Sequence, residues 1–311
     1  VRSTTGSSFV VDSVRGLGND DSMGVLDTTD TALEYLNESE QVLSFDSDGF
    51  SLGDNDPQES FKVNRTGQTY VAWNWKAGGT AASNGDGTIT SSVSANTTAG
   101  FSIAAYTGTG SNTSTVGHGL SVIPELIIIK KRSAGGDWIV GSTSLTSSAA
   151  YNLVLNTAAA QANNASYFTT AATASVFYPG DGSASNGSAG TYIAYCFNSI
   201  EGYSKVGSYT GNGSADGTFI YTGMKPAFLL VKNIPTAARQ WFIFDSARDT
   251  YNTVVKKLYP NLTNAEADAD AYDFVSNGFK VRSTDANWNT SGESYLYLAF
   301  AESPFKTSNA R

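Results

Sequence analysis

The sequence has one cysteine, one histidine and no long apolar run. A single cysteine cannot form a disulfide within the chain, and one histidine with one cysteine is too few for a zinc cluster. No apolar stretch approaches the ~20 residues that a membrane-spanning helix needs, and no signal peptide is visible. We therefore expect no disulfide framework, no zinc site and no membrane insertion.

Positive charge is also scarce, with 19 Lys and Arg against 28 Asp and Glu and a formal net charge of −9. Such a molecule repels a phosphate backbone, so nucleic acid is not an expected partner. What the sequence does contain is 31 Gly, 16 Phe and 16 Tyr. Aromatic residues fit a pleated surface and glycine fits turns, which predicts an all-β protein.

One strand pattern occurs three times, each time beginning at a tyrosine: YVAWNW from Tyr70, YIAYCF from Tyr192 and YLYLAF from Tyr295. Large apolar residues alternate in each copy, as a half-buried strand requires. The spacing of about a hundred residues predicts three related units, each closing on this strand.

A hairpin pattern occurs twice before that strand. ELIIIK (125–130) is followed by Trp138, and AFLLVK (227–232) is followed by Trp241. The first unit shows only the second half of this pattern, because Val1 aligns near Lys131. By this comparison the first unit lacks its opening strands, roughly thirty residues. Asp-Gly and Asn-Gly pairs at Gly49 and Gly278 predict tight turns.

We therefore predict an all-β fold of tandem antiparallel β-sandwich-like units. A partial unit covers residues 1–77 and two further units cover 100–199 and 200–311. Residues 78–99 form either a flexible linker or a short hairpin of 88–90 with 92–94. Residues 30–41 and 264–274 are expected to be short helices. Because a sheet that lacks strands exposes an open edge, either a longer chain or another chain should supply them, and both alternatives point to assembly.

The candidate chemical groups favour structural roles. His118 lies in a Gly-flanked turn without a nucleophile motif, and Cys196 replaces Asn74 and Ala299 of the sister strands, so both are expected to be structural. The segments DSDG (46–49) and DNDPQE (54–59) leave an adventitious Ca²⁺ site as an alternative, and pairs of acidic residues leave a glycan-cleaving enzyme as another. These pairs are Asp46 with Asp48, Asp54 with Asp56, and Asp268 with Asp270. We expect no catalytic residue and no bound cofactor.

Two further features have both a structural and a binding interpretation. The Asp-Ser-x-Arg pattern at Asp12–Arg15 recurs at Asp245–Arg248; it is either a ligand loop or, as we favour, an aspartate that caps a turn and pairs with an arginine. Trp288 and Tyr178 lie in loops rich in Gly, Asn and Ser. They are the candidates for glycan contact, with packing into the core as the alternative.

Long stretches of the sequence resemble a known family. These include DSVRG, FDSDGFSLG, TYVAWNWKAGG, FSIAAYTGTG, PELIIIKKR, WFIFDSARDTYN and YLYLAFAESPFK. They resemble the repeated C-terminal region of large virion proteins of tailed bacteriophages, especially marine ones, and the resemblance covers essentially the whole chain.

The resemblance implies a place on the outer surface of a phage particle, as a tail fibre, an appendage or a head decoration. It implies no catalytic residue. The expected function is therefore a non-enzymatic structural or adhesive virion protein, with other virion proteins as partners and a homo-oligomer, preferably a trimer, as its state. The alternative is a lectin-like module that recognises a host glycan.

Overall fold

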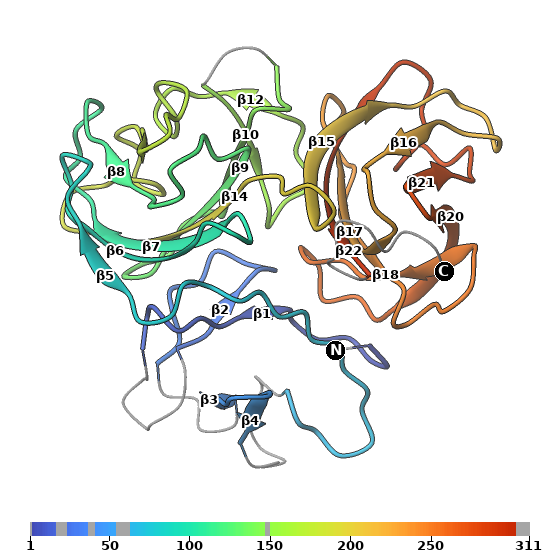
Figure 1. Ribbon diagram of the computed structural model, residues 1–311, viewed down its shortest axis with the longest axis horizontal. Coiled ribbons are helices and arrows are strands. Elements are labelled where there is room, and N and C mark those ends of the chain that lie inside the picture. Colours follow the sequence, from blue (N-terminus) through green and yellow to red (C-terminus); the bar gives the residue numbers. More distant parts are fainter. Residues whose placement is uncertain (1, 17–23, 37–40, 54–62, 147–149, 303–311) are drawn as a thin grey trace.

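The computed structural model describes residues 2–16, 24–36, 41–53, 63–146 and 150–302. These residues form 22 strands and no helix, and every pairing between named strands is antiparallel. The ribbon divides into two large β lobes and a smaller N-terminal lobe, all in mutual contact (Figure 1). The predicted all-β fold of antiparallel, sandwich-like sheets is confirmed.

The second unit is built on one eight-stranded sheet. In spatial order its strands are β12 (Ala162–Asn163), β11 (Tyr151–Val154), β10 (Ile139–Ser142), β9 (Leu126–Lys131), β14 (Thr191–Phe197), β7 (Phe101–Thr107), β6 (Ser91–Asn96) and β5 (Ala82–Asn84). A small sheet of β8 (Val116–Gly117) and β13 (Val176–Phe177) accompanies it. The predicted hairpin before Trp138 is β9 with β10, joined through the pair Ile139–Ile129.

The segment predicted as a linker or hairpin is part of this sheet. β5 pairs with β6, and β6 pairs with β7, so the flexible-linker alternative is wrong for these residues. A hairpin does form, as the other alternative predicts, but its first strand covers residues 82–84 rather than 88–90. Ile89 lies outside it and instead bridges to Val116.

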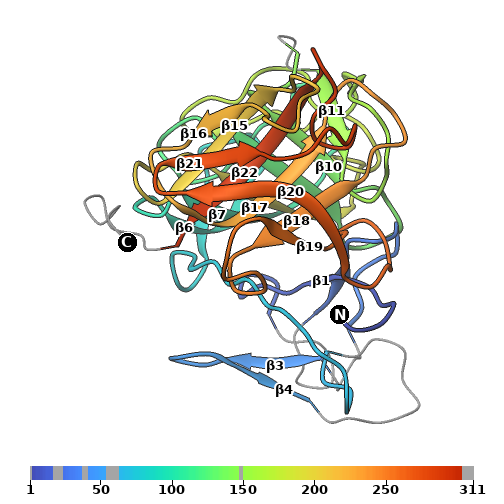
Figure 2. The ribbon, with the colours of Figure 1, turned by 90° about the vertical axis from the view of Figure 1, so that its right-hand side faces the viewer.

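The third unit is a two-sheet sandwich. One sheet has the order β15 (Ser204–Thr210), β22 (Ser294–Ala301), β17 (Pro226–Asn233) and β18 (Trp241–Asp245), and the other has β16 (Phe219–Tyr221), β21 (Gly278–Val281), β20 (Ala267–Val275) and β19 (Val254–Lys257). Figure 2 shows the second sheet in front of the first. A Cβ at Gly278 would lie 2.0 Å from the Ile220 carbonyl oxygen, so the close approach of β16 requires glycine there.

Both predicted helices are wrong within the described residues. Residues 267–275 form β20, in which Asp268 and Asp270 are exposed while Ala271 and Tyr272 are buried. Pairing with β19 and β21 overrides the helix preference of Ala and Glu. Of the other segment, residues 30–36 contain no helical turn, and 37–40 lie outside the described residues.

The first unit contains two short pairs of strands, β1 (Phe9–Val10) with β2 (Leu26–Asp27) and β3 (Val42–Phe45) with β4 (Phe50–Leu52). The turn between β3 and β4 is closed by the Asp46 N–H, which donates to the Gly49 carbonyl at 2.9 Å. Residues 70–75, predicted as a strand from Tyr70, belong to no described strand. In the other two units the equivalent strand pairs with a neighbour on each side, and no described strand does so here.

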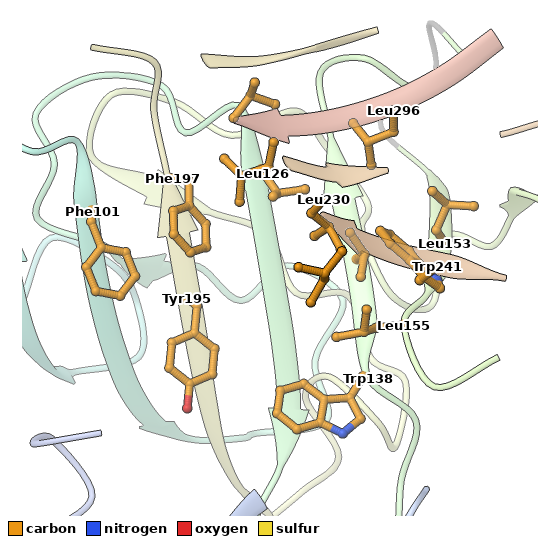
Figure 3. Close-up of a cluster of buried hydrophobic side chains, with 14 of the residues drawn as sticks. Phe101, Leu126, Trp138, Leu153, Leu155, Tyr195, Phe197, Leu230, Trp241 and Leu296 are labelled. Atoms are coloured by element: carbon orange, nitrogen blue, oxygen red, sulfur yellow. The ribbon is translucent and has the colours of Figure 1, made fainter. Parts of the chain in front are cut away.

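A core shared by all three units lies between the lobes. Its buried members include Leu26 of the first unit, Tyr195 and Phe197 of the second, and Leu230 and Trp241 of the third. Figure 3 shows these side chains of the second and third units in one cluster, with Trp138 at its edge. The units therefore share this core, in addition to the separate cores inside the second and third units.

Two central strands each lie between two hydrophobic cores. β14 separates the shared core from the core of the second unit, and β22 separates it from the core of the third unit. Ile193 and Tyr195 of β14 face the shared core, whereas Tyr192 and Cys196 face the core of the second unit. β22 alternates in the same way, with Leu298 facing the shared core and Tyr297 facing the core of the third unit. This period of two follows from the pleat of a strand that is buried on both sides.

Candidate functional site: the contacts that join the three units

One backbone hydrogen bond defines equivalent positions in the three units. The bonds run from Arg2 N–H to the Thr69 carbonyl, from Arg132 N–H to the Thr191 carbonyl and from Ile234 N–H to the Ser294 carbonyl, at 2.8, 2.8 and 2.9 Å. Arg2 therefore takes the place of Arg132, as the predicted alignment requires, while Val1 itself lies outside the described residues. The backbone of the first unit therefore makes the same hydrogen bond as the other two units at this position, although its residues 70–75 pair with no strand.

The Asp12–Arg15 pattern forms a buried ionic cluster that we call the first clamp. The Asp12 Oδ1 atom caps the following turn by accepting the Val14 and Arg15 N–H groups at 3.0 and 3.1 Å. The Arg15 guanidinium, fully buried, donates to Asp12 and to Glu34 at 2.5 and 2.8 Å. This confirms the structural interpretation of the pattern, a turn cap with a paired arginine.

Two residues of the second unit complete the first clamp. The Arg132 Nε donates to Glu34 at 2.7 Å, and the Tyr195 hydroxyl donates to the Asp12 Oδ2 atom at 2.7 Å. The cluster thus links the first unit to β14 and to the end of β9. Each carboxylate has at least two donors, which offsets much of the cost of burying its charge.

The Asp245–Arg248 pattern forms the second clamp in the same way. The Arg248 Nε donates to Asp245 at 2.6 Å and its Nη1 donates to Glu266 at 2.9 Å. The partners from the neighbouring unit are now Arg2, whose Nε donates to Glu266 at 2.8 Å, and Trp73, whose indole N–H donates to Asp245 at 3.2 Å. The second clamp thus joins the third unit to the first.

At the third equivalent position the polar set is replaced by mainly apolar residues. Ser142 and Leu145 take the places of the aspartate and arginine, and Ile234 and Leu298 take the places of the neighbouring arginine and aromatic donor. Gln161 takes the place of Glu34, because its N–H donates to the Ile234 carbonyl at 2.8 Å just as the Glu34 N–H donates to the Arg132 carbonyl at 3.0 Å. The second and third units therefore meet through packing where the other pairs of units meet through charge.

Two buried tryptophans each add a hydrogen bond between neighbouring units. The Trp138 indole N–H donates to the Asp27 carbonyl at 2.7 Å, and the Trp241 indole N–H donates to the Val154 carbonyl at 3.1 Å. Between the third and first units, the Gly6 N–H donates to the Thr263 carbonyl at 2.8 Å. The units therefore form a closed ring in which each contacts both others.

In each clamp one carboxyl group has a lowered pKa, Asp12 in the first and Glu266 in the second. Burial alone would raise the pKa of Asp12, but the charge of Arg15 and the Tyr195 hydroxyl outweigh it and lower that pKa. Burial would likewise raise the pKa of Glu266, but the hydrogen bonds and charges of Arg2 and Arg248 lower it from 4.5 to about 2.

This shift predicts an acid-dependent loss of stability at the second clamp. Between about pH 4.5 and pH 2 the unfolded chain binds a proton at Glu266 that the folded protein does not, so the free energy of unfolding falls as the pH falls through this window. Glu266→Gln should remove this dependence and flatten the curve of unfolding free energy against pH, measured by urea denaturation. Asp268→Asn, at an exposed position nearby, should keep the slope of the parent; equal slopes for the Glu266→Gln variant and the parent would contradict the assignment.

The two single-copy side chains lie in the core of the second unit. The His118 ring accepts the Leu120 N–H at 3.2 Å through Nδ1, and its Nε2 lies 3.1 Å from the Thr173 carbonyl, so both nitrogens serve the local backbone. Burial lowers the pKa of His118. Cys196 is fully buried, and burial raises the pKa of its thiol to about 12. Their predicted structural placement is confirmed.

The predicted glycan contact at Trp288 is wrong. Its side chain is 1% exposed and packs edge-on against Phe242 and Phe244, because its loop folds down over the core of the third unit. Tyr178 is half-buried and stays an untested candidate. Composition cannot separate a loop that stands out from one that packs down. Among the described residues, the most exposed aromatic rings are Tyr251 at 85% and Tyr221 at 68%, and neither stood out in the sequence.

The acidic pairs are solvated or engaged locally. Asp46 accepts the hydroxyls of Ser44 and Ser51, each at 2.8 Å. Asp268 and Asp270 are exposed on β20, and Asp54 and Asp56 lie outside the described residues. Over the described part of the chain, no group of three or more His, Cys, Asp or Glu is arranged to hold a metal ion.

The tyrosines that begin the repeated strand and the tryptophans that follow the repeated hairpin, which we expect to be the main architectural residues, differ in burial. Tyr192 and Tyr295 are fully buried and donate their hydroxyls to the Ser183 and Ala286 carbonyls, at 2.8 and 3.0 Å. Trp138 and Trp241 are each 1% exposed. Tyr70, in the unpaired segment, is only half-buried. The predicted key positions are therefore core residues in the two complete units and less so in the first.

Several partners in the two clamps could not be recognised from the sequence. Glu34, Glu266 and Arg132 carry no local motif, and only their equivalent positions in the repeats could have revealed them. Lys130 and Lys232 are also fully buried, and each donates to a carbonyl of its own hairpin loop, at 2.7 and 2.8 Å. Burial lowers the pKa of each lysine to about 8.

Among the described segments, none is a helix of the length and hydropathy that crossing a bilayer requires. Neither the curated proteins nor the solved structures contain a match to this chain. Residues 1–304 match one family, which is described as a domain of unknown function. With nearly its whole length matched, the chain belongs to the DUF7483 family.

Proposed function

We propose that this protein is a non-enzymatic structural component on the outside of a bacteriophage virion, as a tail fibre, appendage or head decoration. The observation that carries the proposal is the closed ring of units, since its buried charged clusters join one unit to the next. In other proteins, buried charged groups that contact one another often lie in a catalytic site. Here they hold parts of a β scaffold together.

The surface and the resemblance support the same proposal. An acidic protein with a formal net charge of −9 stays soluble when many copies are crowded together. Three units that share one core form a stiff body, which suits a spacer or a cover more than a moving part. The resemblance to repeated regions of phage virion proteins supplies the biological setting, and other virion proteins are the proposed partners.

Quantitative mass spectrometry of purified source particles tests this proposal. We expect peptides of this protein in the particles at a constant ratio to the major capsid protein. Hundreds of copies would indicate a capsid decoration, and a few copies in multiples of three or six would indicate a fibre or spike with the proposed trimer. Absence from washed particles would overturn the virion role and favour the free lectin-like alternative.

A further inference from the structure

Residues 70–77 run as an extended segment with one half-buried side and one exposed side. Val71, Trp73 and Trp75 are half-buried, whereas Ala72 and Asn74 are exposed. Trp75 packs against the rings of Phe228 and Phe300, each at a centroid distance of 5.5 Å. The segment therefore has the side-chain alternation and the packing of a strand on the shared core.

What this segment lacks is a ladder of hydrogen bonds. Within the described residues no strand pairs with 70–75, and no backbone-to-backbone hydrogen bond involves them. The equivalent strands are flanked on both sides, β14 by β9 and β7, and β22 by β17 and β15. An extended segment with unpaired N–H and C=O groups is a template for pairing with another strand.

Comparison with the other two units shows where a strand next to residues 70–75 would lie. β9 leads into Arg132, which bonds to Thr191, and β17 leads in the same way to Ile234. In the first unit Arg2 makes that bond to Thr69, and β1 takes the place of β10. The position between β1 and residues 70–75 therefore corresponds to that of β9 and β17.

We propose that residues 70–75 accept an antiparallel β-strand at this position, supplied in line with Val1 by polypeptide that leads directly into Arg2. Its chemistry follows from β17, where Phe228 and Leu230 face the shared core while Leu229 and Val231 face the other way. The accepted strand therefore carries large apolar residues at the alternate positions next to Trp73 and Trp75. This inference does not depend on the virion role.

Amide hydrogen exchange, read by NMR, tests the proposal. In the protein of residues 1–311, the amides of residues 71–75 should exchange at least about 100-fold faster than those of residues 193–197, which lie in a complete ladder. An extension with the sequence of residues 226–232, placed directly before Val1, should slow exchange at 71–75 by at least about 100-fold and raise the melting temperature.

Two matched extensions supply the control. Serine at the positions copied from Phe228 and Leu230 should abolish the protection, and serine at those copied from Leu229 and Val231 should keep most of it. Equal behaviour of the two serine forms, or no added protection by any extension, would overturn the proposal. Protection by the same strand as a free peptide, without protection by the extension, would overturn the in-line path.

Discussion

Replacing Arg15 with alanine should destabilise the protein by about 3–5 kcal/mol, because the change leaves two carboxylates buried without their shared counter-charge. The side chains of Asp12 and Glu34 are only 3% and 5% exposed, so water cannot take over the role of the guanidinium. The measurement is the free energy of unfolding from guanidinium denaturation at pH 7. A loss below about 1 kcal/mol, the range of exposed ion pairs, would show that the first clamp is solvated.

The chain itself offers a control for this result. Changing the first clamp to the residues of the third equivalent position removes all the charges together. The variant combines Asp12→Ser, Arg15→Leu, Glu34→Gln, Arg132→Ile and Tyr195→Leu. Because apolar replacement of a complete buried ion cluster is often neutral or stabilising, this variant should recover most of the stability that Arg15→Ala loses. A larger loss than that of Arg15→Ala would mean that the clamp contributes net stability.

Trp241→Ala should cost about 3–5 kcal/mol, the usual range for truncating a large buried aromatic side chain. Trp241 is 1% exposed in the shared core and donates its indole N–H across the boundary to Val154. The same denaturation experiment measures the loss. Since the three units share one core, fluorescence and circular dichroism should report a single transition at a lower denaturant concentration.

Two substitutions separate the contributions at this position. Trp241→Phe keeps most of the apolar contact but loses the hydrogen bond, and we expect a smaller loss than for alanine. Tyr251→Ala removes a ring that is 85% exposed and should change stability by less than about 0.5 kcal/mol. Two separate transitions in the Trp241→Ala protein would contradict the shared core and indicate that the third unit unfolds alone.

The sequence predicted best those elements whose partners are close along the chain. The hairpin of β9 with β10 and that of β17 with β18 were both recognisable, because their apolar runs are joined by short polar turns and occur twice. The turn at Gly49 was recognisable for the same reason. Internal repetition served here as a check, since a chance pattern would not recur at equivalent places.

The errors occurred where distant parts of the chain decide the structure. Ala and Glu favour a helix near residues 264–274, but pairing with β19 and β21 makes most of that stretch a strand. The pattern from Tyr70 has the alternation of a strand, yet alternation cannot show whether neighbours are present to pair with it. Trp288 lies in a polar loop that folds inward, and no local feature indicates the direction in which a loop packs.

The candidate site was predicted in part. The pairing of Asp12 with Arg15 was accessible because the two residues are close in sequence and the pattern is repeated. Glu34 and Arg132 were not accessible, since their bond joins residues that are 98 positions apart. The apolar third position could be recognised only after the registers of all three units were known.

The closed ring also determines when the protein can fold during its synthesis. The ion pair of Arg2 cannot form until Glu266 is synthesised, 264 residues later. The hydrogen bond from Tyr195 to Asp12 likewise joins residues that are synthesised 183 positions apart. Contacts of such long range make folding slow, and the N-terminal lobe leaves the ribosome long before its partners exist. During that interval its short strands and half-buried tryptophans remain uncovered, so the nascent chain rather than the finished protein is the form most exposed to aggregation.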